Sequence, residues 1–152
     1  MTERRDFIKK SALGTAGIII GGMGMSAKSY ASIKGANDRI HLAVIGIRGQ
    51  GNAHIGTWCS LKDNRNVLLK TLCDVDEELY PERVKKVEDA TGVKPKTEWD
   101  MRRVFDDKEI HAVSIATPNH WHALATIWAC QAGKHVYVEK PASHNIYEGR
   151  KM

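Results

Sequence analysis

The residues whose types and spacing point most directly to chemistry lie in a glycine-rich turn at 46–51, directly after an apolar run at 40–45. Backbone N–H groups in the first turn of a helix have no intrahelical partner and lie at the positive end of the helix dipole. Such a turn binds phosphate when the backbone can approach closely, and glycine permits that approach. A glycine-rich connection that binds nothing has the same pattern. The predicted phosphate-binding residues are Gly46, Arg48, Gly49, Gln50 and Gly51.

An acidic residue follows the second apolar run of the chain. The run 67–73 is typical of a buried strand and leads into Asp74, roughly 20 residues beyond the glycines, where a βαβ nucleotide site binds a ribose. A carboxylate there accepts hydrogen bonds from the ribose hydroxyls and repels a 2′-phosphate, so Asp74 favours NAD over NADP. Helix capping is its alternative role, but Asp76 is the better cap for the next helix.

A lysine and two histidines follow later strands. Lys140 comes after the strand predicted at 135–139, at the edge of the sheet where doubly wound folds bind ligands, so its ammonium can hydrogen-bond a reacting oxygen. The ordinary alternative is a solvated surface lysine. His120 and His122 lie close together, but no third ligand is near and the start of a helix does not direct both at one ion, so we expect no metal.

The elements that position these residues alternate between strand and helix from Asp38 onward. Strands are predicted at 40–46, 67–73, 94–97, 111–117 and 135–139, with helices at 53–61, 76–91, 99–106 and 119–132. This alternation predicts an α/β fold with a doubly wound parallel sheet, a Rossmann-like dinucleotide-binding domain. In the last long helix, Asn119 is the expected cap and the expected inner face is Leu124, Ile127 and Cys130.

Composition and charge fit one globular domain that does not bind nucleic acid. The chain has 152 residues, 42% hydrophobic, with a net charge of +5. Residues 1–31 hold five Lys or Arg against two acids, which leaves little net charge for the remainder and no basic surface for nucleic acid. Each of Cys59, Cys73 and Cys130 replaces an apolar residue, and we expect buried free thiols rather than a disulfide.

The first 31 residues predict an export signal rather than part of the fold. Arg4 and Arg5 precede an apolar pair and two lysines, a Gly/Ala/Ile-rich stretch follows, and 29–31 supplies small residues for cleavage. We expect a twin-arginine signal over 1–31, a mature domain over 32–152, and a periplasmic or other extracytoplasmic location. The alternative is an uncleaved signal that anchors the protein, although the apolar stretch is shorter than the roughly 20 residues of a spanning helix.

Together these motifs resemble the N-terminal half of the Gfo/Idh/MocA family of NAD(P)-dependent sugar and cyclitol oxidoreductases. The resemblance covers nearly all of 39–152 and is most specific in the run 132–141, which contains Glu139-Lys140-Pro141. It implies that the glycine turn holds the pyrophosphate of NAD and that Asp74 binds the adenosine ribose. It also implies that five residues lie beside the nicotinamide or the substrate: Thr117, Asn119, His122, Glu139 and Lys140.

Two features depart from the family pattern. Arg48 stands where the family has the middle glycine of the turn; its side chain can add a cation beside the pyrophosphate, or the turn can shift its register onto Gly49 and Gly51. Family members also continue into a second α/β domain that supplies the oligomer interface, the sugar pocket and usually a histidine acid/base. We therefore expect this chain to be incomplete at its C-terminus and the longer form to be a homo-oligomer.

The function expected from the sequence is that of an NAD-binding domain in an exported oxidoreductase. By the resemblance, it acts by hydride transfer on a sugar or cyclitol hydroxyl, with Lys140 as the catalytic residue. Because free NAD is scarce outside the membrane, the cofactor would load before export and stay bound, and turnover would be redox-neutral. One such reaction is a glycosidase that transiently oxidises its sugar at C3. The competing hypothesis is a nucleotide-binding fragment without catalytic activity.

Overall fold

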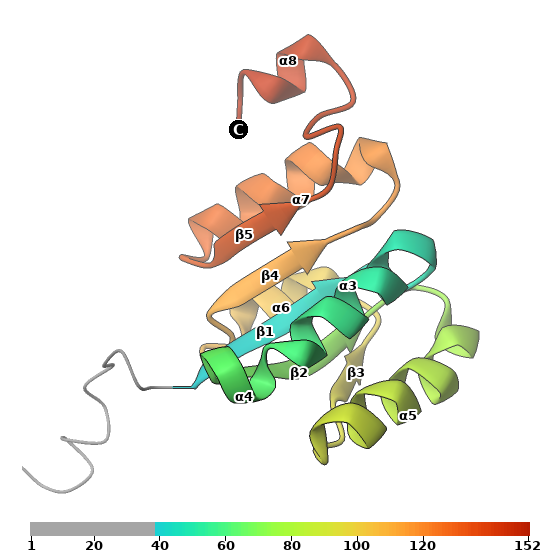
Figure 1. The fold of residues 1–152 in the computed structure, drawn as a ribbon. Helices are drawn as coiled ribbons and strands as arrows, with labels where there is room; N and C mark the ends of the chain where they lie inside the picture. Colours follow the sequence, from blue (N-terminus) through green and yellow to red (C-terminus); the bar gives the residue numbers. More distant parts are fainter. Residues whose placement is uncertain (1–38) are drawn as a thin grey trace, which may run out of the picture. The chain divides into compact units, whose positions relative to one another are not determined.

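A five-stranded parallel sheet forms the centre of the computed structural model, which describes residues 39–152 (Figure 1). The predicted export signal lies outside the described residues. The strand order is β3-β2-β1-β4-β5, and all four pairings are parallel. The strands are β1 (Ile40–Ile45), β2 (Val67–Cys73), β3 (Lys96–Glu98), β4 (Ala112–Ile115) and β5 (His135–Val138).

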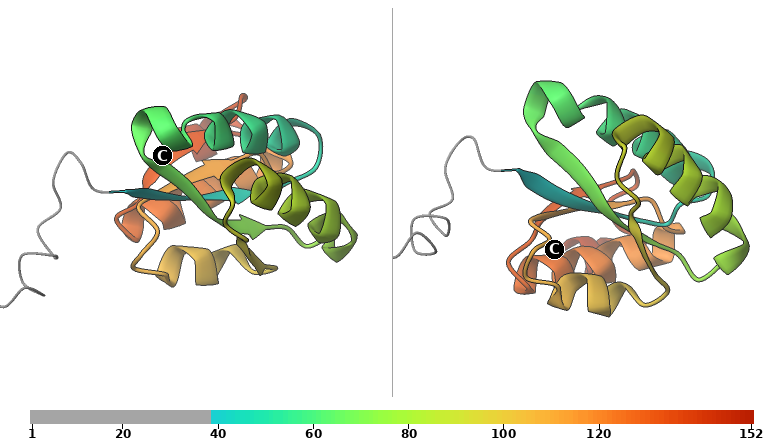
Figure 2. Two further views of the ribbon diagram at one scale, coloured as in Figure 1. Left: turned by 60° about the horizontal axis from the view of Figure 1, so that its bottom comes forward. Right: turned by 90° about the horizontal axis from the view of Figure 1, so that it is seen from below.

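Helices cover both faces of this sheet, which gives three layers (Figure 2). One face carries α3 (Gly49–Ser60), α4 (Lys62–Arg65) and α5 (Tyr80–Thr91), and the other carries α6 (Met101–Asp106) and α7 (Asn119–Gln131). A 3₁₀ turn, η1 (Glu77–Leu79), precedes α5, and a short helix, α8 (Ile146–Gly149), follows β5. Of the helices in 39–152, none combines the length and hydrophobicity that a bilayer crossing requires.

The strands are apolar on both faces because helices bury both faces. Leu42 and Val44 of β1 pack into the cluster under α3 and α5, whereas Ala43 and Ile45 pack into the cluster under α6 and α7. Side chains alternate along a strand, so a continuous apolar run supplies two cores at once.

The strand order reverses between β1 and β4, and this reversal positions the site. From β1 the chain moves outward through β2 to β3, and it then returns to β4 on the other side of β1. Ile45 pairs with Ile115 at the carboxyl ends of these two strands. Ligands of doubly wound folds bind in the crevice outside such a switch point.

Most predicted elements are confirmed, with shifted ends. The strand at 67–73 has the predicted bounds, and α5 ends at Gly92, which has φ +69°. The third strand lies at 96–98 rather than 94–97, and α3 begins at Gly49, four residues before the prediction. The doubly wound parallel fold is therefore confirmed.

The prediction for α7 is wrong in two respects. Leu124 is 39% exposed and Cys130 is also exposed, because the helix turns small residues such as Ala125 and Ala129 toward the sheet. Pro118 occupies the N-cap position and Asn119 is the first helical residue, so Asn119 does not cap the helix. The prediction of buried free thiols holds for Cys59 and Cys73 and fails for Cys130, which is free but exposed.

Candidate dinucleotide site

The glycine turn begins with a backbone that only glycine fits. Gly46 has φ +82°, and a Cβ placed on it would lie 2.7 Å from the carbonyl carbon and oxygen of Ala116. Its N–H donates to the carbonyl oxygen of Cys73 at 2.8 Å. The turn is thereby held between the carboxyl ends of β2 and β4.

Gly51 lets the first turn of α3 pack onto Gly46. A Cβ on Gly51 would lie 1.7 Å from the carbonyl oxygen of Gly46, whereas a Cβ on Gly49 would meet nothing within 4 Å. The side chain of Arg48, the N-cap residue of α3, makes no capping hydrogen bond to this helix. The first-turn N–H groups of α3 therefore remain available to an anion.

Hydrogen bonds from two neighbouring segments hold Ile47 of the turn in place. Its N–H donates to Asp74 Oδ2 at 2.8 Å, and its carbonyl oxygen accepts from Arg83 Nε of α5 at 3.1 Å. Asp74 Oδ1 also accepts the N–H of Asp76 at 3.0 Å. Two backbone donors thus orient the Asp74 carboxylate, which keeps further lone pairs for a ligand.

Arg48 takes an extended backbone, with φ −77° and ψ −173°, which any residue can adopt. Its side chain is 75% exposed and donates to the carboxylate of Asp76. Of the two alternatives for this position, the structure does not favour a register shift onto Gly49 and Gly51, because the tight positions are Gly46 and Gly51 and a Cβ on Gly49 would make no close contact. The turn accommodates an arginine in place of the middle glycine because the Arg48 side chain extends into solvent.

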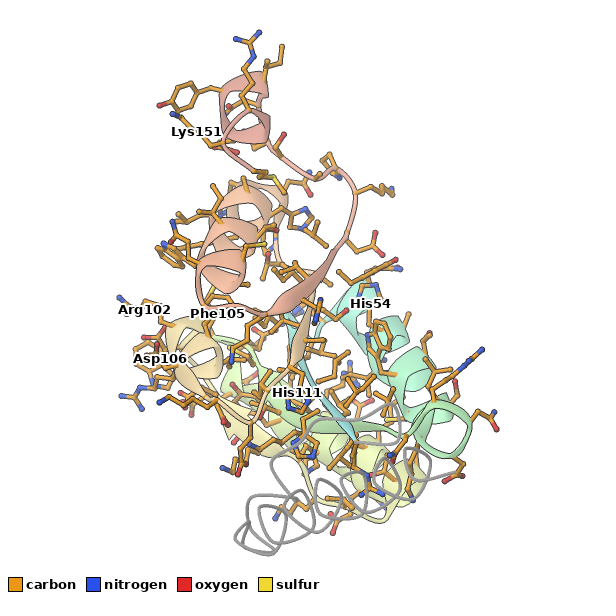
Figure 3. The ribbon with its side chains drawn as sticks, turned by 90° about the vertical axis from the view of Figure 1, so that its left-hand side faces the viewer. His54, Arg102, Phe105, Asp106, His111 and Lys151 are labelled. Carbon is orange, nitrogen blue, oxygen red and sulfur yellow. The ribbon has the colours of Figure 1, made fainter. Side chains whose placement is uncertain are left out.

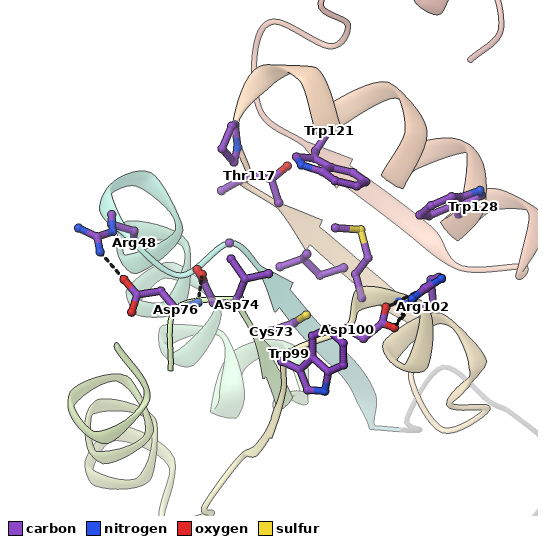
Figure 4. A pocket seen from close by; sticks show the side chains of 16 residues that line it. Arg48, Cys73, Asp74, Asp76, Trp99, Asp100, Arg102, Thr117, Trp121 and Trp128 are labelled. Carbon is purple, nitrogen blue, oxygen red and sulfur yellow. Dashed lines mark hydrogen bonds and ion pairs between the residues drawn. The ribbon is translucent and has the colours of Figure 1, made fainter. Parts of the chain in front are cut away.

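A cleft of about 590 Å³ opens beside the turn (Figure 4). Gly46, Arg48, Asp74 and Asp76 line one end of it. Its other walls include Trp99, Met101, Thr117, Pro118, Trp121 and Trp128. An apolar slot with aromatic side chains next to a carboxylate suits a heteroaromatic base linked to a ribose.

Two polar features distinguish the walls of this cleft. The hydroxyl of Thr117 is buried and has no hydrogen-bond partner within residues 39–152, so it can bond to a ligand. Asp100 and Arg102 form an ion pair, and the side-chain hydrogen bond from Arg102 holds the pKa of Asp100 below its usual range.

Cys73 lines the cleft with a thiol that is almost fully buried. Burial raises the pKa of this thiol to about 12, and the nearby carboxylates of Glu98, Asp74 and Asp100 add to the shift. Tyr80 lies at the same end of β2, where its hydroxyl is 2.6 Å from the carbonyl oxygen of Asp74 and 2.8 Å from that of Glu98 and shares its one hydrogen between them. Burial also raises the pKa of Tyr80 to about 12.

The structure brings part of the predicted site together. Four of the predicted residues line the cleft: Gly46, Arg48, Asp74 and Thr117. The others lie in the first turn of α3 or beyond the ends of β4 and β5: Gly49, Gln50, Gly51, Asn119, His122, Glu139 and Lys140. Asn119 and Lys140 are both exposed.

Glu139 takes part in a network that the sequence analysis did not include. Its Oε1 lies 2.8 Å from His54 Nε2 and 3.2 Å from Gln50 Nε2, and His54 Nδ1 lies 3.0 Å from the hydroxyl of Ser114. The hydrogen bond from His54 is the main reason that the pKa of Glu139 is lowered, and the N–H of Lys140 contributes. The network joins α3, on one side of the sheet in Figure 3, to the end of β5.

The order serine, histidine, glutamate is also that of a hydrolytic triad. Ser114 has no exposed surface, so no substrate can reach its hydroxyl. A nucleophile has to contact the reacting carbon. This network therefore serves to position the loop after β5.

His122 joins the loops that follow β4 and β5. The ring is 1% exposed, with Nε2 2.8 Å from the carbonyl oxygen of Thr117 and Nδ1 2.7 Å from that of Pro141. Both nitrogens face carbonyl oxygens, so His122 is not directed toward the cleft. Within residues 39–152, no three His, Cys, Asp or Glu side chains are placed to hold a metal ion.

Arg83 and His54 also belong to this site, although the sequence did not predict them there. Both are buried polar residues on helix faces that otherwise pack against the sheet. A charged or imidazole side chain that is buried on such a face indicates a specific hydrogen-bond partner, because buried polar groups are almost always hydrogen-bonded. The sequence shows that signal but not the partner.

The residues present fit a dinucleotide. Uncapped N–H groups at the start of α3 suit a pyrophosphate, and the fixed carboxylate of Asp74 suits the ribose hydroxyls. The buried hydroxyl of Thr117, which has no hydrogen-bond partner among residues 39–152, belongs to a residue that lines the same space.

Comparisons with known proteins agree with this reading. Residues 40–152 match the model of the Gfo/Idh/MocA oxidoreductase family, described as having an NAD-binding Rossmann fold. A glycosyl hydrolase family 109 protein from Shewanella pealeana is 27% identical over 96% of this chain and 35% of its own length. The chain therefore spans about a third of the length of that relative.

Levoglucosan dehydrogenase is similar in both sequence and structure. The enzyme from Pseudarthrobacter phenanthrenivorans is 49% identical over 53 residues, which are 35% of this chain and 14% of the enzyme. A solved structure of levoglucosan dehydrogenase in complex with NADH has a TM-score of 0.65 at 30% identity, over 75% of this chain and 31% of that one.

Proposed function

The chain belongs to the Gfo/Idh/MocA oxidoreductase family, with its NAD-binding Rossmann fold, and we propose that it binds NAD for hydride transfer at a hydroxyl-bearing carbon of a sugar or cyclitol. The observation that carries the proposal is the Asp74 carboxylate, oriented by the N–H groups of Ile47 and Asp76 at one end of the cleft. Levoglucosan dehydrogenase, a structural neighbour, was solved with NADH and levoglucosan, which supports a sugar substrate.

Each part of the cofactor has a matching surface. The first-turn N–H groups of α3 would hold the pyrophosphate, Asp74 would hold the adenosine ribose, and the part of the cleft lined by Trp99 and Pro118 would take the adenine. Asp74 favours NAD over NADP because a carboxylate repels a 2′-phosphate. The hydroxyl of Thr117 then gains the partner it lacks within the described residues.

When bound, the nicotinamide ring exchanges hydride with the substrate carbon. Lys140 follows β5 at the carboxyl edge of the sheet, and its exposed ammonium is free to hydrogen-bond the reacting oxygen. The network of His54 and Glu139 anchors the backbone at Lys140, whose N–H donates to Glu139 Oε2 at 3.1 Å. Lys140 is our candidate catalytic residue.

A second candidate function is redox-neutral cleavage of a glycosidic bond. The match to glycosyl hydrolase family 109 proteins over 96% of the chain favours it. Oxidation of the sugar at C3 would acidify the hydrogen on C2, and its loss would expel the glycosidic oxygen. Water would then add, and the hydride would return to C3, so no cofactor is consumed.

We also propose that the protein is exported by the twin-arginine route with its cofactor bound. The support is the sequence at 4–10 and 29–31. The test compares the periplasmic fraction of cells that express the chain with that of an Arg4→Lys, Arg5→Lys variant. Equal periplasmic amounts of the two would contradict export by this route.

Calorimetry of the full 152-residue chain with NAD and NADP tests the cofactor assignment. We expect NAD to bind more tightly than NADP, and Asp74→Ala to weaken NAD binding by at least about tenfold, because hydrogen bonds to a charged group are lost. No binding of either dinucleotide would contradict the proposal. For the whole protein, cleavage of a glycoside without accumulation of reduced nicotinamide would favour the glycosidase over the dehydrogenase.

A further inference from the structure

Three charged side chains lie together at the end of the cleft where Asp74 is placed. Arg48, Asp74 and Asp76 all line this end. Asp74 and Asp76 are connected through the backbone, since the N–H of Asp76 donates to Asp74 Oδ1 at 3.0 Å. The local charge is therefore set by two carboxylates and one guanidinium.

Within this group, Arg48 forms an ion pair with Asp76. Its guanidinium donates to Asp76 Oδ2, while Asp76 Oδ1 accepts the N–H of Glu78 at 3.2 Å and caps η1. The cap fixes Asp76, and Asp76 in turn holds the exposed arginine side chain at this end of the cleft (Figure 4).

An arginine beside the adenosine ribose would ordinarily favour a 2′-phosphate, because a guanidinium pairs with phosphate through two parallel hydrogen bonds. Here the same guanidinium is already paired with a carboxylate. A 2′-phosphate would have to displace Asp76 from Arg48 and then lie beside the Asp74 and Asp76 carboxylates, whose only partners would be backbone N–H groups.

We infer that Asp76 is a second determinant of the preference for NAD over NADP, acting by occupying Arg48, in addition to Asp74. This inference rests on the proposed function, because it assumes that the ribose lies at Asp74. Asp76 is a positioning residue: it acts on the dinucleotide through Arg48.

Asp76→Asn is the informative variant. Asparagine keeps a side-chain oxygen to cap η1 but removes the charge that holds Arg48. We expect calorimetry of the full chain to show about tenfold tighter NADP binding, the effect of one charge-assisted hydrogen bond at an exposed site. NAD affinity should change by less than about threefold, because the ribose hydroxyls bind to Asp74.

Glu77→Gln is the matched control, since it removes an exposed negative charge from the adjacent position. It should leave the ratio of NADP to NAD affinity unchanged. The double variant Arg48→Gln, Asp76→Asn should lose the gain in NADP affinity, because the freed guanidinium is its source.

Arg48→Gln alone provides a test that does not depend on the cap of η1. Arg48 is 75% exposed, so its replacement should preserve the fold. We expect NADP binding to weaken further, because two unneutralised carboxylates then face the 2′-phosphate.

The inference is overturned if Asp76→Asn leaves the NADP to NAD ratio unchanged, or if the double variant keeps the gain. It is also overturned if Arg48→Gln improves NADP binding. These results would leave the proposed function intact as long as the unmodified chain binds NAD. An unmodified chain that binds neither dinucleotide would instead contradict the proposed function, and this inference with it.

Discussion

His54 of α3 and Glu139 beyond β5 are joined directly: His54 Nε2 lies 2.8 Å from Glu139 Oε1. Because a carboxylate only accepts, Nε2 carries a hydrogen, and Nδ1 lies 3.0 Å from the hydroxyl of Ser114. The helix proposed to bind the pyrophosphate through its first-turn N–H groups is thus linked to the segment that carries Lys140. The two halves of the proposed site are held together by one buried imidazole.

This contact makes the stability of the domain depend on pH through Glu139. The pKa of Glu139 is lowered from 4.5, mainly by the hydrogen bond from His54. A carboxyl whose pKa is lowered in the folded state stabilises that state above its unfolded pKa, and the contribution is lost as the pH falls through the folded pKa.

Thermal unfolding of the unmodified chain and of Glu139→Gln, followed from about pH 7 downward, measures this contribution. We expect the unmodified chain to have the higher melting temperature at neutral pH. The difference between the two melting temperatures should shrink as the pH falls below the usual pKa of a glutamate. Glu88→Gln, at an exposed helix position, should show no such convergence. Parallel curves for Glu139→Gln and the unmodified chain would contradict the assigned role.

Gly51 and Gly49 form a pair for testing the glycine turn. Gly51→Ala would place its Cβ 1.7 Å from the carbonyl oxygen of Gly46, which is backbone and cannot rotate away. We expect the free energy of unfolding in urea to fall by about 3 kcal/mol, as for severe overpacking. NAD binding should weaken as well.

Gly49→Ala is the control for this prediction. A Cβ at Gly49 meets nothing within 4 Å, and the residue is the first of α3. Stability should stay the same or rise by up to about 1 kcal/mol, because alanine is the better helix former. Equal losses in the two variants would show that Gly51 is not required for close packing.

The fold was predictable because its determinants are local. A strand buried on both faces needs a continuous apolar run, and Val67–Cys73 supplies one with the predicted bounds. Gly92 ends α5 as predicted because its φ of +69° favours glycine. The place of Asp74 in the site was also predictable, because it directly follows the second strand at the usual number of residues after the glycine turn.

The remaining features depend on pairs that are distant in sequence. His54 and Ser114 are 60 residues apart, and Arg83 and Ile47 are 36 apart, so no local pattern indicates these contacts. The error at Cys130 has a different cause. Large apolar residues were expected to face the sheet, but α7 turns its alanines inward and leaves Leu124 and Cys130 exposed.

The two thiols Cys73 and Cys130 should differ sharply in reactivity. Burial raises the pKa of Cys73 from 9.0 to about 12, which lowers its thiolate fraction near neutral pH by about a thousandfold. Cys130 is exposed and serves as the internal reference. Mass spectrometry after iodoacetamide treatment at about pH 8 should find Cys130 modified and Cys73 unmodified until urea is added. Equal rates in the folded chain would contradict the burial of Cys73.

His122 should matter for both stability and cofactor binding. Its ring lies between the carbonyl oxygens of Thr117 and Pro141, at 2.8 and 2.7 Å. His122→Ala leaves a cavity and removes the donor between the two loops, which should lower the free energy of unfolding by about 3 kcal/mol. NAD affinity should fall as well, because Thr117 loses the contact that fixes it beside the cleft.

His120→Ala is the matched control, since His120 lies two residues away on the same helix and is exposed. Urea unfolding and calorimetry should both give values close to those of the unmodified chain. If His122→Ala lowers stability but leaves NAD affinity unchanged, then the buried ring stabilises α7 without positioning Thr117. If both properties fall in His122→Ala alone, the imidazole links the loop after β4 to the loop after β5, as the two carbonyl contacts indicate.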